Sequence, residues 1–313
     1  MHQPVMVSEV VQYLRCVQGG LFVDGTLGTG GHTLAILEHS PATTQVIGID
    51  RDPESLILAR ERLKPYAKRL RLIQGKFGDL RENLSKLGIE AVDGIILDLG
   101  FSSYQIESQG RGFSFQREDP LDMRMDQTQG ISALDWLAQT NEKELVRVLI
   151  EYGEERWAKR IARRIMAFQS EGQLQTTRDL AEMIVRSVPG GKSRERIHPA
   201  TRTFQALRIQ INDELAQLKA FLNEFLQTLT NGGRVCLISY HSLEDRLIKQ
   251  AFLKLERGEV DPLGMRAPCR PQGQPVFERV VSKPVIPSPD EIKENPRSRG
   301  AKLRVGERRG EVS

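Results

Sequence analysis

The first hundred residues alternate short β-branched runs with segments of helical spacing, and few folds are compatible with this pattern. The predicted strands are Leu21 to Asp24, Gln45 to Asp50, Arg69 to Ile73 and Gly94 to Asp98, and Pro53 to Leu63 is a predicted helix. Nearly continuous apolar strands are typical of a parallel sheet that is covered by helices on both faces. Such sheets bind ligands at the carboxyl ends of their strands. We therefore predict an α/β fold with a mostly parallel sheet.

The alternating pattern is interrupted once, in the middle of the chain. From about Gln105 to Asn212 the sequence indicates a loop followed by helices, and a long helical pattern continues from Pro199 to about Leu229. The turn Asn231-Gly232-Gly233 then introduces another predicted strand, Arg234 to Tyr240. We expect a split α/β domain, residues 1–104 and 213–313, that carries a helical insertion at residues 105–212.

Local signals refine this division. Ser132, Asn141 and Thr177 are predicted helix N-caps, and Pro189-Gly190-Gly191 is a predicted helix stop. The stretch from Asp261 to Pro289 is rich in proline and glycine around a predicted strand or hairpin. The last twenty residues are charged, and we expect them to be partly mobile.

Composition excludes some classes of protein. Hydrophobic residues make up 39% of the 313 positions, which is enough for a folded core, and no apolar run approaches the roughly 20 residues that span a bilayer. Because the N-terminus also lacks a signal-peptide pattern, we expect a soluble cytoplasmic protein without a membrane partner. Cys16, Cys236 and Cys269 form no CxxC pair, so free thiols and no metal are predicted. The net charge of +4 suits a polyanionic partner without identifying one.

The first predicted strand continues directly into a glycine-rich turn, Asp24-Gly25-Thr26-Leu27-Gly28-Thr29-Gly30-Gly31-His32. Glycines permit a positive φ and let a ligand approach the backbone. The second strand ends at Asp50, about twenty residues beyond the glycines, where a carboxylate can accept both hydroxyls of an adenosine ribose. The two features together indicate an adenosine cofactor, and a tight turn without a ligand is the alternative.

Two adenosine cofactors remain in competition at such a turn. The diphosphate of NAD needs a bare helix N-terminus close to it. Here Asp24 precedes the glycines, where a carboxylate would oppose a diphosphate and suit a cationic methionine moiety. Phe77-Gly78-Asp79 follows the third strand, where methyltransferases commonly hold the adenine. S-adenosylmethionine is therefore the predicted cofactor, with an NAD-dependent oxidoreductase as the alternative.

The fourth strand leads into the loop Asp98-Leu99-Gly100-Phe101-Ser102-Ser103-Tyr104-Gln105, where amino-methylating enzymes carry an acidic or amide residue followed by an aromatic one. An exocyclic amine on a base is a poor nucleophile, so a hydrogen bond that fixes its approach accelerates methyl transfer. We expect Asp98 to accept an amine proton and Phe101 or Tyr104 to stack on the base. A role of Asp98 in capping the turn is the alternative.

The end of the fifth strand supplies further candidates. Tyr240, His241 and Ser242 follow a strand that is adjacent to the fourth one in this fold type, so we expect them to hold the target base. A hydrolase triad is not favoured, because there is no G-x-S-x-G turn. Methylation at cytosine C5 would need a thiolate, and Pro268-Cys269 lies far from the catalytic loops. Amine methylation is therefore the preferred chemistry, with Asp98 as a positioning group rather than a base.

Longer motifs resemble the bacterial 16S rRNA (cytosine-N4)-methyltransferase family, RsmH, formerly MraW. Besides the glycine turn and the loop after Asp98, they are His2-Gln3-Pro4-Val5, Gly110 to Phe115, Pro120 to Asp126, His198 to Arg208, Ser239 to Arg246 and Ala301-Lys302-Leu303-Arg304. The motifs occur in the family's order over nearly the whole chain. The resemblance implies a class I S-adenosylmethionine-dependent methyltransferase, Rossmann-like, with an inserted helical domain for RNA recognition.

The resemblance also implies a site and a substrate. Gly30, Gly31, His32, Asp50, Phe77, Asp98 and Gln105 would line the S-adenosylmethionine site. The acceptor would be the N4 amine of a decoding-centre cytidine, at position 1402 of the 16S rRNA within the small ribosomal subunit, and no DNA is expected. Thr29 stands where the family usually has glycine, Phe101 replaces a valine and Tyr104 replaces a proline. These departures leave the cofactor prediction intact.

Basic residues are concentrated in the insertion. Arg156, Lys159, Arg160, Arg163 and Arg164 recur at helical spacing, and Lys192, Arg194, Arg196, Arg202 and Arg208 surround Gly190-Gly191. We expect an RNA cradle there, although a solvated face has the same pattern. The residues predicted to contact RNA are Phe101, Tyr104, Arg111, Lys192, Arg194, Arg196, His198 and Arg202, with local capping as an equal alternative for His198. A non-catalytic RNA-binding or assembly factor is the alternative function, and the oligomeric state, homo-oligomers included, stays open.

Overall fold

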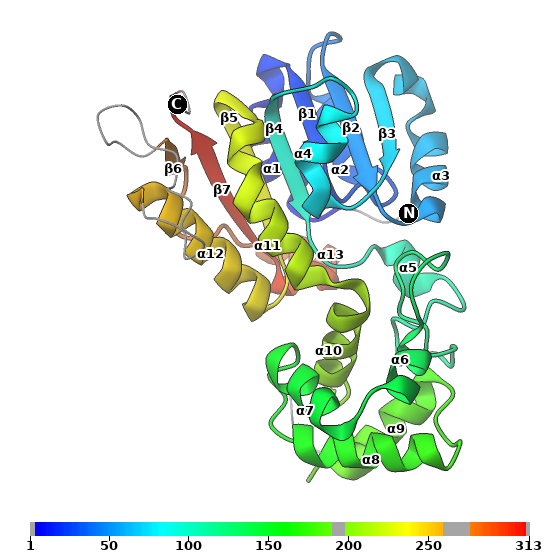
Figure 1. Ribbon diagram of the computed structural model, residues 1–313. Helices are drawn as coiled ribbons and strands as arrows, with labels where there is room; N and C mark the ends of the chain where they lie inside the picture. The colour runs from blue at the N-terminus through cyan, green and yellow to red at the C-terminus, as the bar shows by residue number, and fades with distance from the viewer. Residues whose placement is uncertain (1–3, 190–197, 259–275, 311–313) are drawn as a thin grey trace. The chain divides into compact units, whose positions relative to one another are not determined.

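The computed structural model describes residues 4–189, 198–258 and 276–310 (Figure 1). The chain divides into two compact units. The first, which we call the sheet unit, comprises Met1–Gly100 and Leu215–Ser313, and the second, the helical unit, comprises Phe101–Glu214. The insertion expected from the sequence was residues 105–212.

One seven-stranded sheet organises the sheet unit, in the order β3-β2-β1-β4-β5-β7-β6. Its strands are β1 (Leu21–Asp24), β2 (Gln45–Asp50), β3 (Leu70–Gln74), β4 (Val92–Asp98), β5 (Leu229–Ser239), β6 (Phe277–Arg279) and β7 (Lys302–Arg308). The strands from β3 to β5 are parallel, and β7 runs antiparallel to both β5 and β6. The predicted α/β fold with a mostly parallel sheet is confirmed.

The alternation of side chains along the central strands creates two cores, one on each face of the sheet. Val23, Ile95 and Leu97 pack in the core beneath α4, α11 and α12, whereas Phe22 and Ile96 pack in the core of α1, α2 and α3. Figure 1 shows α4, α11 and α12 on the near face of the sheet. The helices are α1 (Val7–Tyr13), α2 (Gly31–Glu38), α3 (Pro53–Arg62), α4 (Leu80–Ser85), α11 (Glu214–Glu224), α12 (Ser242–Arg257) and α13 (Pro289–Glu294). Because helices cover both faces of the sheet, ligands bind at the carboxyl ends of its strands.

The helical unit has its own core. Its helices are α5 (Ser103–Glu107), α6 (Ala133–Gln139), α7 (Glu142–Glu151), α8 (Ala158–Ser170), α9 (Thr177–Ser187) and α10 (Thr201–Asn212). Ser132 and Asn141 are N-caps, as predicted, because their side chains accept the backbone N–H three residues later. The third cap is Thr176 rather than Thr177, and it forms a capping box with Asp179.

Two predictions about the C-terminal half are wrong. The helical pattern from Pro199 to Leu229 is broken at Asp213, whose φ of 51° lies in the left-handed region and separates α10 from α11. The charged last twenty residues, which were expected to be partly mobile, contain β7, which pairs with β5 and β6. Leu303 and Val305 are buried there, so the apolar residues of the tail pack in the core while its charges form ion pairs. The fifth strand also begins earlier than predicted, at Leu229.

Residues 259–275 lie outside the described residues, and with them the Pro268-Cys269 pair and about half of the stretch from Asp261 to Pro289, in which a strand or hairpin was predicted. The described part of that stretch contains the strand β6. The helix stop predicted at Gly190-Gly191 lies outside them too. Cys16 and Cys236 are buried free cysteines. Within the described ranges, no helix combines the length and the apolar character that a membrane span requires.

A buried amide fastens the loop before α6 to the end of α10. Asn212 accepts the backbone N–H of Met125 at 2.8 Å and donates to the carbonyl oxygens of Met123 and Arg208 at 2.8 and 2.9 Å. We expect Asn212→Ala to lower the free energy of unfolding by about 3 kcal/mol, because buried backbone groups lose their partners. Urea denaturation measures this loss. Gln210→Ala, on the same helix but half-buried, is the control, and an equal loss in both variants would contradict the assignment.

Candidate functional site

Three neighbouring strands end in an aspartate at the same edge of the sheet. β2 ends at Asp50, β1 at Asp24 and β4 at Asp98, and these strands are adjacent in the order β2-β1-β4. Burial raises the pKa of the Asp24 carboxyl, and it raises the pKa values of Asp50 and Asp98 to about 6. The charge of Asp24 raises both of the latter values further. This edge therefore concentrates negative charge, and a bound cation would relieve the repulsion.

The glycine turn between β1 and α2 is shaped by two residues of positive φ, Gly28 at 52° and Gly30 at 80°. A Cβ on Gly30 would lie 2.8 Å from the Leu63 side chain, so glycine is required there for space as well as for conformation. Thr29, which replaces the family's usual glycine, is not among the residues of positive φ. Its carbonyl and hydroxyl oxygens accept from Arg62 at 3.4 Å. The threonine is thus compatible with the turn.

Asp50 ties the second strand to the glycine turn. Its Oδ2 accepts the backbone N–H of Gly28 at 2.7 Å, and its Oδ1 accepts that of Asp52 at 2.9 Å. Each carboxylate oxygen has a second lone pair that can accept a further hydrogen bond. Asp50 is therefore both oriented by the backbone and able to receive two hydroxyl groups.

Asp98 is held from three sides. Its backbone N–H donates to Thr26 Oγ1 at 2.6 Å, and its carboxylate Oδ1 accepts from the Tyr240 hydroxyl at 2.7 Å. Its Oδ2 lies 3.9 Å from Nδ1 of the buried His32. The Asp98 side chain is 20% exposed, so a ligand can reach it. The structure thus brings together three residues that the sequence assigned to the catalytic and cofactor groups.

The other two residues predicted at the end of β5 have different surroundings. His241 is the N-cap residue of α12, and its Nε2 lies 3.1 Å from Glu244 Oε1. Ser242 is exposed at the start of that helix. Of this group, Tyr240 is the residue with a hydrogen bond to Asp98. Sequence reasoning grouped the three by position and could not distinguish the one that reaches the carboxylate.

Phe77 lies beside the glycine turn. It begins a 3₁₀ helix after β3, is half-buried and meets Phe221 edge-on, with 6.3 Å between the ring centroids. A Cβ built on Gly25 would be 3.3 Å from the Phe77 Cβ. Because Gly25 has no side chain, the Cβ of Phe77 and the turn backbone approach each other closely.

Several predicted contacts fall in the helical unit. Gln105 is buried, and its Oε1 accepts the N–H of Ser102 in the capping box of α5, while Tyr104 is half-buried. The Phe101 ring stacks on Phe113 at 5.7 Å between centroids, and the Arg208 guanidinium lies 4.4 Å from its centroid. These contacts pack Phe101 and Phe113 inside the unit.

The predicted RNA contact of Arg111 needs correction. The residue is only 3% exposed, and its guanidinium donates to the Met125 carbonyl oxygen at 2.7 Å, so it stabilises the interior of the helical unit. Arg208 is also turned inward, in a bidentate pair with Glu214 at 2.8 and 2.9 Å. A sequence cannot distinguish a basic residue that binds RNA from one that satisfies buried carbonyl or carboxylate groups.

The remaining predicted RNA contacts have mixed surroundings. His198 is exposed, stacks on Phe115 at 4.5 Å and accepts the Ala200 N–H through Nδ1 at 3.2 Å, as the capping alternative expects. Arg202 donates to the Glu154 carbonyl oxygen at 3.2 Å. Lys192, Arg194 and Arg196 lie outside the described residues.

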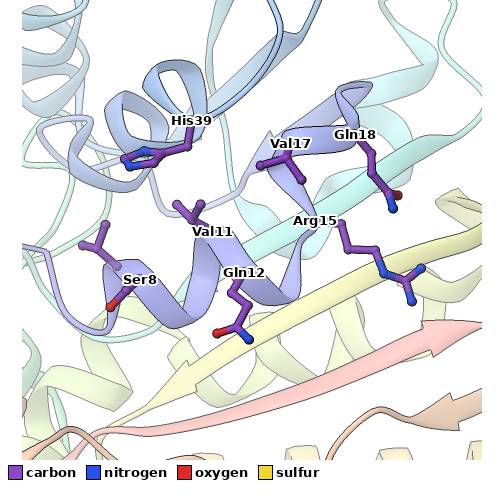
Figure 2. Close-up of a pocket in the computed structure, with 8 residues that line it drawn as sticks. Ser8, Val11, Gln12, Arg15, Val17, Gln18 and His39 are labelled. Carbon is purple, nitrogen blue, oxygen red and sulfur yellow. The ribbon is translucent and has the colours of Figure 1, made fainter.

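A surface hollow of about 650 Å³ lies elsewhere on the sheet unit (Figure 2). Residues of α1 and of the segment that follows it line the hollow together with His39, which lies at the C-terminal end of α2. The glycine turn is at the opposite, N-terminal end of α2. None of the predicted site residues lines this hollow, so it is separate from the three aspartates.

Comparisons with known proteins agree with this geometry. The model of the MraW methylase family matches residues 1–309. The chain is 47% identical over 307 residues to the ribosomal RNA small subunit methyltransferase H of Geotalea uraniireducens, and it is 45% identical over 307 residues to the protein of that name from Geobacter sulfurreducens. Each alignment covers 98% of both chains. With the fold of a class I S-adenosylmethionine-dependent methyltransferase, the chain belongs to the MraW methylase family.

Proposed function

We propose that this chain transfers the methyl group of S-adenosylmethionine to the exocyclic N4 amine of a cytidine in 16S rRNA. The observation that carries the proposal is the Asp98 carboxylate, which is fixed by Tyr240 at the open edge of the sheet and remains partly exposed. The relatives' names support a small-subunit rRNA substrate, and the family resemblance supports the decoding-centre cytidine. A ribosomal substrate also supports a cytoplasmic location.

The donor set of the sheet unit fits S-adenosylmethionine better than NAD. Asp50 retains lone pairs for two ribose hydroxyls, and Phe77 lies where an adenine ring would meet an apolar surface. The carboxylates of Asp24 and Asp98 favour a cation and oppose a diphosphate. When bound, S-adenosylmethionine supplies a methyl group carried on a positively charged sulfonium.

Asp98 positions the acceptor. The lone pair of an exocyclic amine is delocalised into the ring of the base, so the amine attacks only from a well-defined direction. The Asp98 carboxylate accepts from the Tyr240 hydroxyl, and the Asp98 backbone N–H donates to the Thr26 hydroxyl, so the carboxylate can accept one amine hydrogen and fix that direction. Holding the reacting atoms about 3 to 3.5 Å apart supplies much of the acceleration. The amine proton becomes acidic as the new bond forms, so a strong base is not required.

The helical unit supplies a surface for RNA. Arg156, Lys159, Arg160, Arg163 and Arg164, which we call the α8 basic stripe, are all exposed. The opposite side of α8 is buried through Ala158, Ile161, Ala162 and Ile165. Phosphate contacts orient an RNA without selecting a base, so selection falls to the residues around Asp98 and to the shape of the ribosomal particle.

The charge of the three aspartates should appear in the cofactor affinity. We expect the preference for S-adenosylmethionine over S-adenosylhomocysteine, measured by calorimetry, to fall severalfold from about pH 8 to about pH 5. Protonation of carboxyls whose pKa is about 6 removes the attraction for the sulfonium. The neutral thioether is the matched control because it lacks only that charge. A pH-independent ratio, or binding of NAD in place of both ligands, would contradict this account.

Asp98 should be essential for turnover. We expect Asp98→Asn to slow the methylation of undermodified small subunits by about a hundredfold or more, because the acceptor of the amine hydrogen is lost. Tyr240→Phe, which removes only the hydroxyl donor to Asp98, should slow it by about tenfold. Mass spectrometry of nucleosides should find N4-methylcytidine in the wild-type reaction.

Other outcomes separate the competing functions. Methyl label on cytosine C5, or on protein alone, would refute amine methylation. Cofactor binding without any turnover by the wild-type protein would favour a non-catalytic assembly factor. A comparison of naked rRNA with assembled subunits shows whether the particle is required.

The α8 basic stripe should determine the salt dependence of RNA binding. We expect simultaneous replacement of Lys159, Arg160 and Arg163 by glutamine to weaken binding and to lower the slope of log affinity against log salt by about 0.7 to 0.9 per lost phosphate contact. Fluorescence anisotropy across a salt series measures the slope. Replacing the exposed Arg60, Lys64 and Lys68 of the sheet unit is the matched control. Identical slopes in the two triple variants would exclude the stripe from the interface.

A further inference from the structure

The orientation of His32 determines which ring nitrogen carries its hydrogen. Nε2 lies 2.9 Å from the carbonyl oxygen of Val5, and a carbonyl oxygen can only accept. Nε2 is therefore the donor, and in the neutral ring Nδ1 has a bare lone pair. The His32 side chain is buried, so water does not compete for this contact.

The bare nitrogen faces a second acceptor. His32 Nδ1 lies 3.9 Å from Asp98 Oδ2, slightly beyond hydrogen-bonding distance. The bare imidazole nitrogen and the carboxylate oxygen are both acceptors, so they can form a hydrogen bond only when one of them carries a proton. Asp98 cannot turn away without losing the hydrogen bond from the Tyr240 hydroxyl to Oδ1. The pair is thus arranged to receive one proton.

The groups around this pair are mainly acidic. Asp24 and Glu244 raise the pKa of Asp98, whereas His32 and the Tyr240 hydroxyl lower it, and burial has the largest effect, upward. Glu244 also faces Tyr240, as does Glu291. Burial and these carboxylates therefore oppose the charged form of Asp98, so a proton that reaches it stays there unless a neighbouring base removes it.

We propose that His32 is a positioning residue that takes up, on Nδ1, the proton that the substrate amine releases through Asp98, and so returns Asp98 to its ionised form. This inference rests on the proposed function. During transfer the C–N bond forms as the donor's C–S bond breaks, and the amine nitrogen becomes positively charged. Its N–H bond then breaks as an O–H bond forms on Asp98 Oδ2, and the proton passes to His32 Nδ1. Asp98 is again ionised, and the charge that left the sulfonium is held on the imidazole.

The N-terminal segment fixes the ring in this orientation. A Cβ on Gly31 would lie 2.9 Å from the Pro4 ring, so the absence of a side chain lets Pro4 and Val5 pack against the start of α2. The backbone N–H of Met6 donates to Glu291 at 2.7 Å and anchors the segment to α13. The Val5 carbonyl oxygen is thereby held against His32.

The test compares His32→Gln with His39→Gln, a histidine variant at the exposed end of the same helix. Single-turnover methylation of undermodified small subunits with saturating labelled S-adenosylmethionine is followed against pH. We expect His32→Gln to be about tenfold slower near neutral pH, and its acid limb to move to higher pH, because the proton on Asp98 can then leave only to solvent base. The rate should recover in alkaline solution, and the saturating S-adenosylmethionine keeps any change of cofactor affinity out of the measured rate. His39→Gln should match the wild type.

The acid limb is the fall in rate at low pH. If His32→Gln is slower by the same factor at every pH, with no shift of this limb, the proposal is overturned and His32 has only a packing role. An unchanged profile would also overturn it. Absence of N4-methylcytidine with the wild-type protein would instead refute the proposed function, so the two failures are distinguishable. A second measurement does not depend on a variant: in wild-type protein with ¹⁵N-labelled histidine, the directly bonded hydrogen of neutral His32 must appear on Nε2. A hydrogen on Nδ1 would overturn the proposal.

Discussion

The repulsion among three carboxylates at one edge of the sheet, one of them buried and two half-buried, is the constraint on which the rest of the site depends. Asp24, Asp50 and Asp98 meet there because parallel strands place their carboxyl ends together. Burial penalises the charged forms of the three carboxyl groups, because the helices that cover both faces of the sheet limit their contact with water. The surrounding hydrogen bonds compensate for this cost, and a cationic ligand completes the compensation.

Each carboxylate has compensating contacts of a different kind, and this difference separates their roles. Asp24 accepts from Thr33 and Thr26 and supports the turn. Asp50 accepts two backbone N–H groups and keeps lone pairs for hydroxyls. Asp98 has a phenol and an imidazole beside it. The adenosine end of the site is therefore built from backbone contacts, and the reactive end from titratable side chains.

Much of the sheet unit could be predicted because its signals are local. The end of each of the first four strands was placed correctly or within one residue, and the caps Ser132 and Asn141 were identified from the residue type before a helical pattern. Predictions failed where tertiary contacts outweigh local character. Charged residues of β7 looked like a mobile tail, yet Arg304 and Lys302 pair with Asp245 while Leu303 is buried. Asp213 interrupts a continuous helical pattern through a backbone conformation that no residue-type rule indicates.

The sequence by itself determined the alternation of strands and helices, the glycine turn, the aspartates that end β1, β2 and β4 and, through long motifs, the family. These features depend on residues that are close together in the sequence, so the order of residues is enough to predict them. Only the tertiary structure decided that Tyr240 rather than His241 or Ser242 reaches Asp98, that Arg111 and Arg208 are turned inward, and which nitrogen of His32 faces the carboxylate. Those facts depend on side-chain directions and on backbone groups far away in the chain, such as the carbonyl of Val5. Residue types alone carry no information about them.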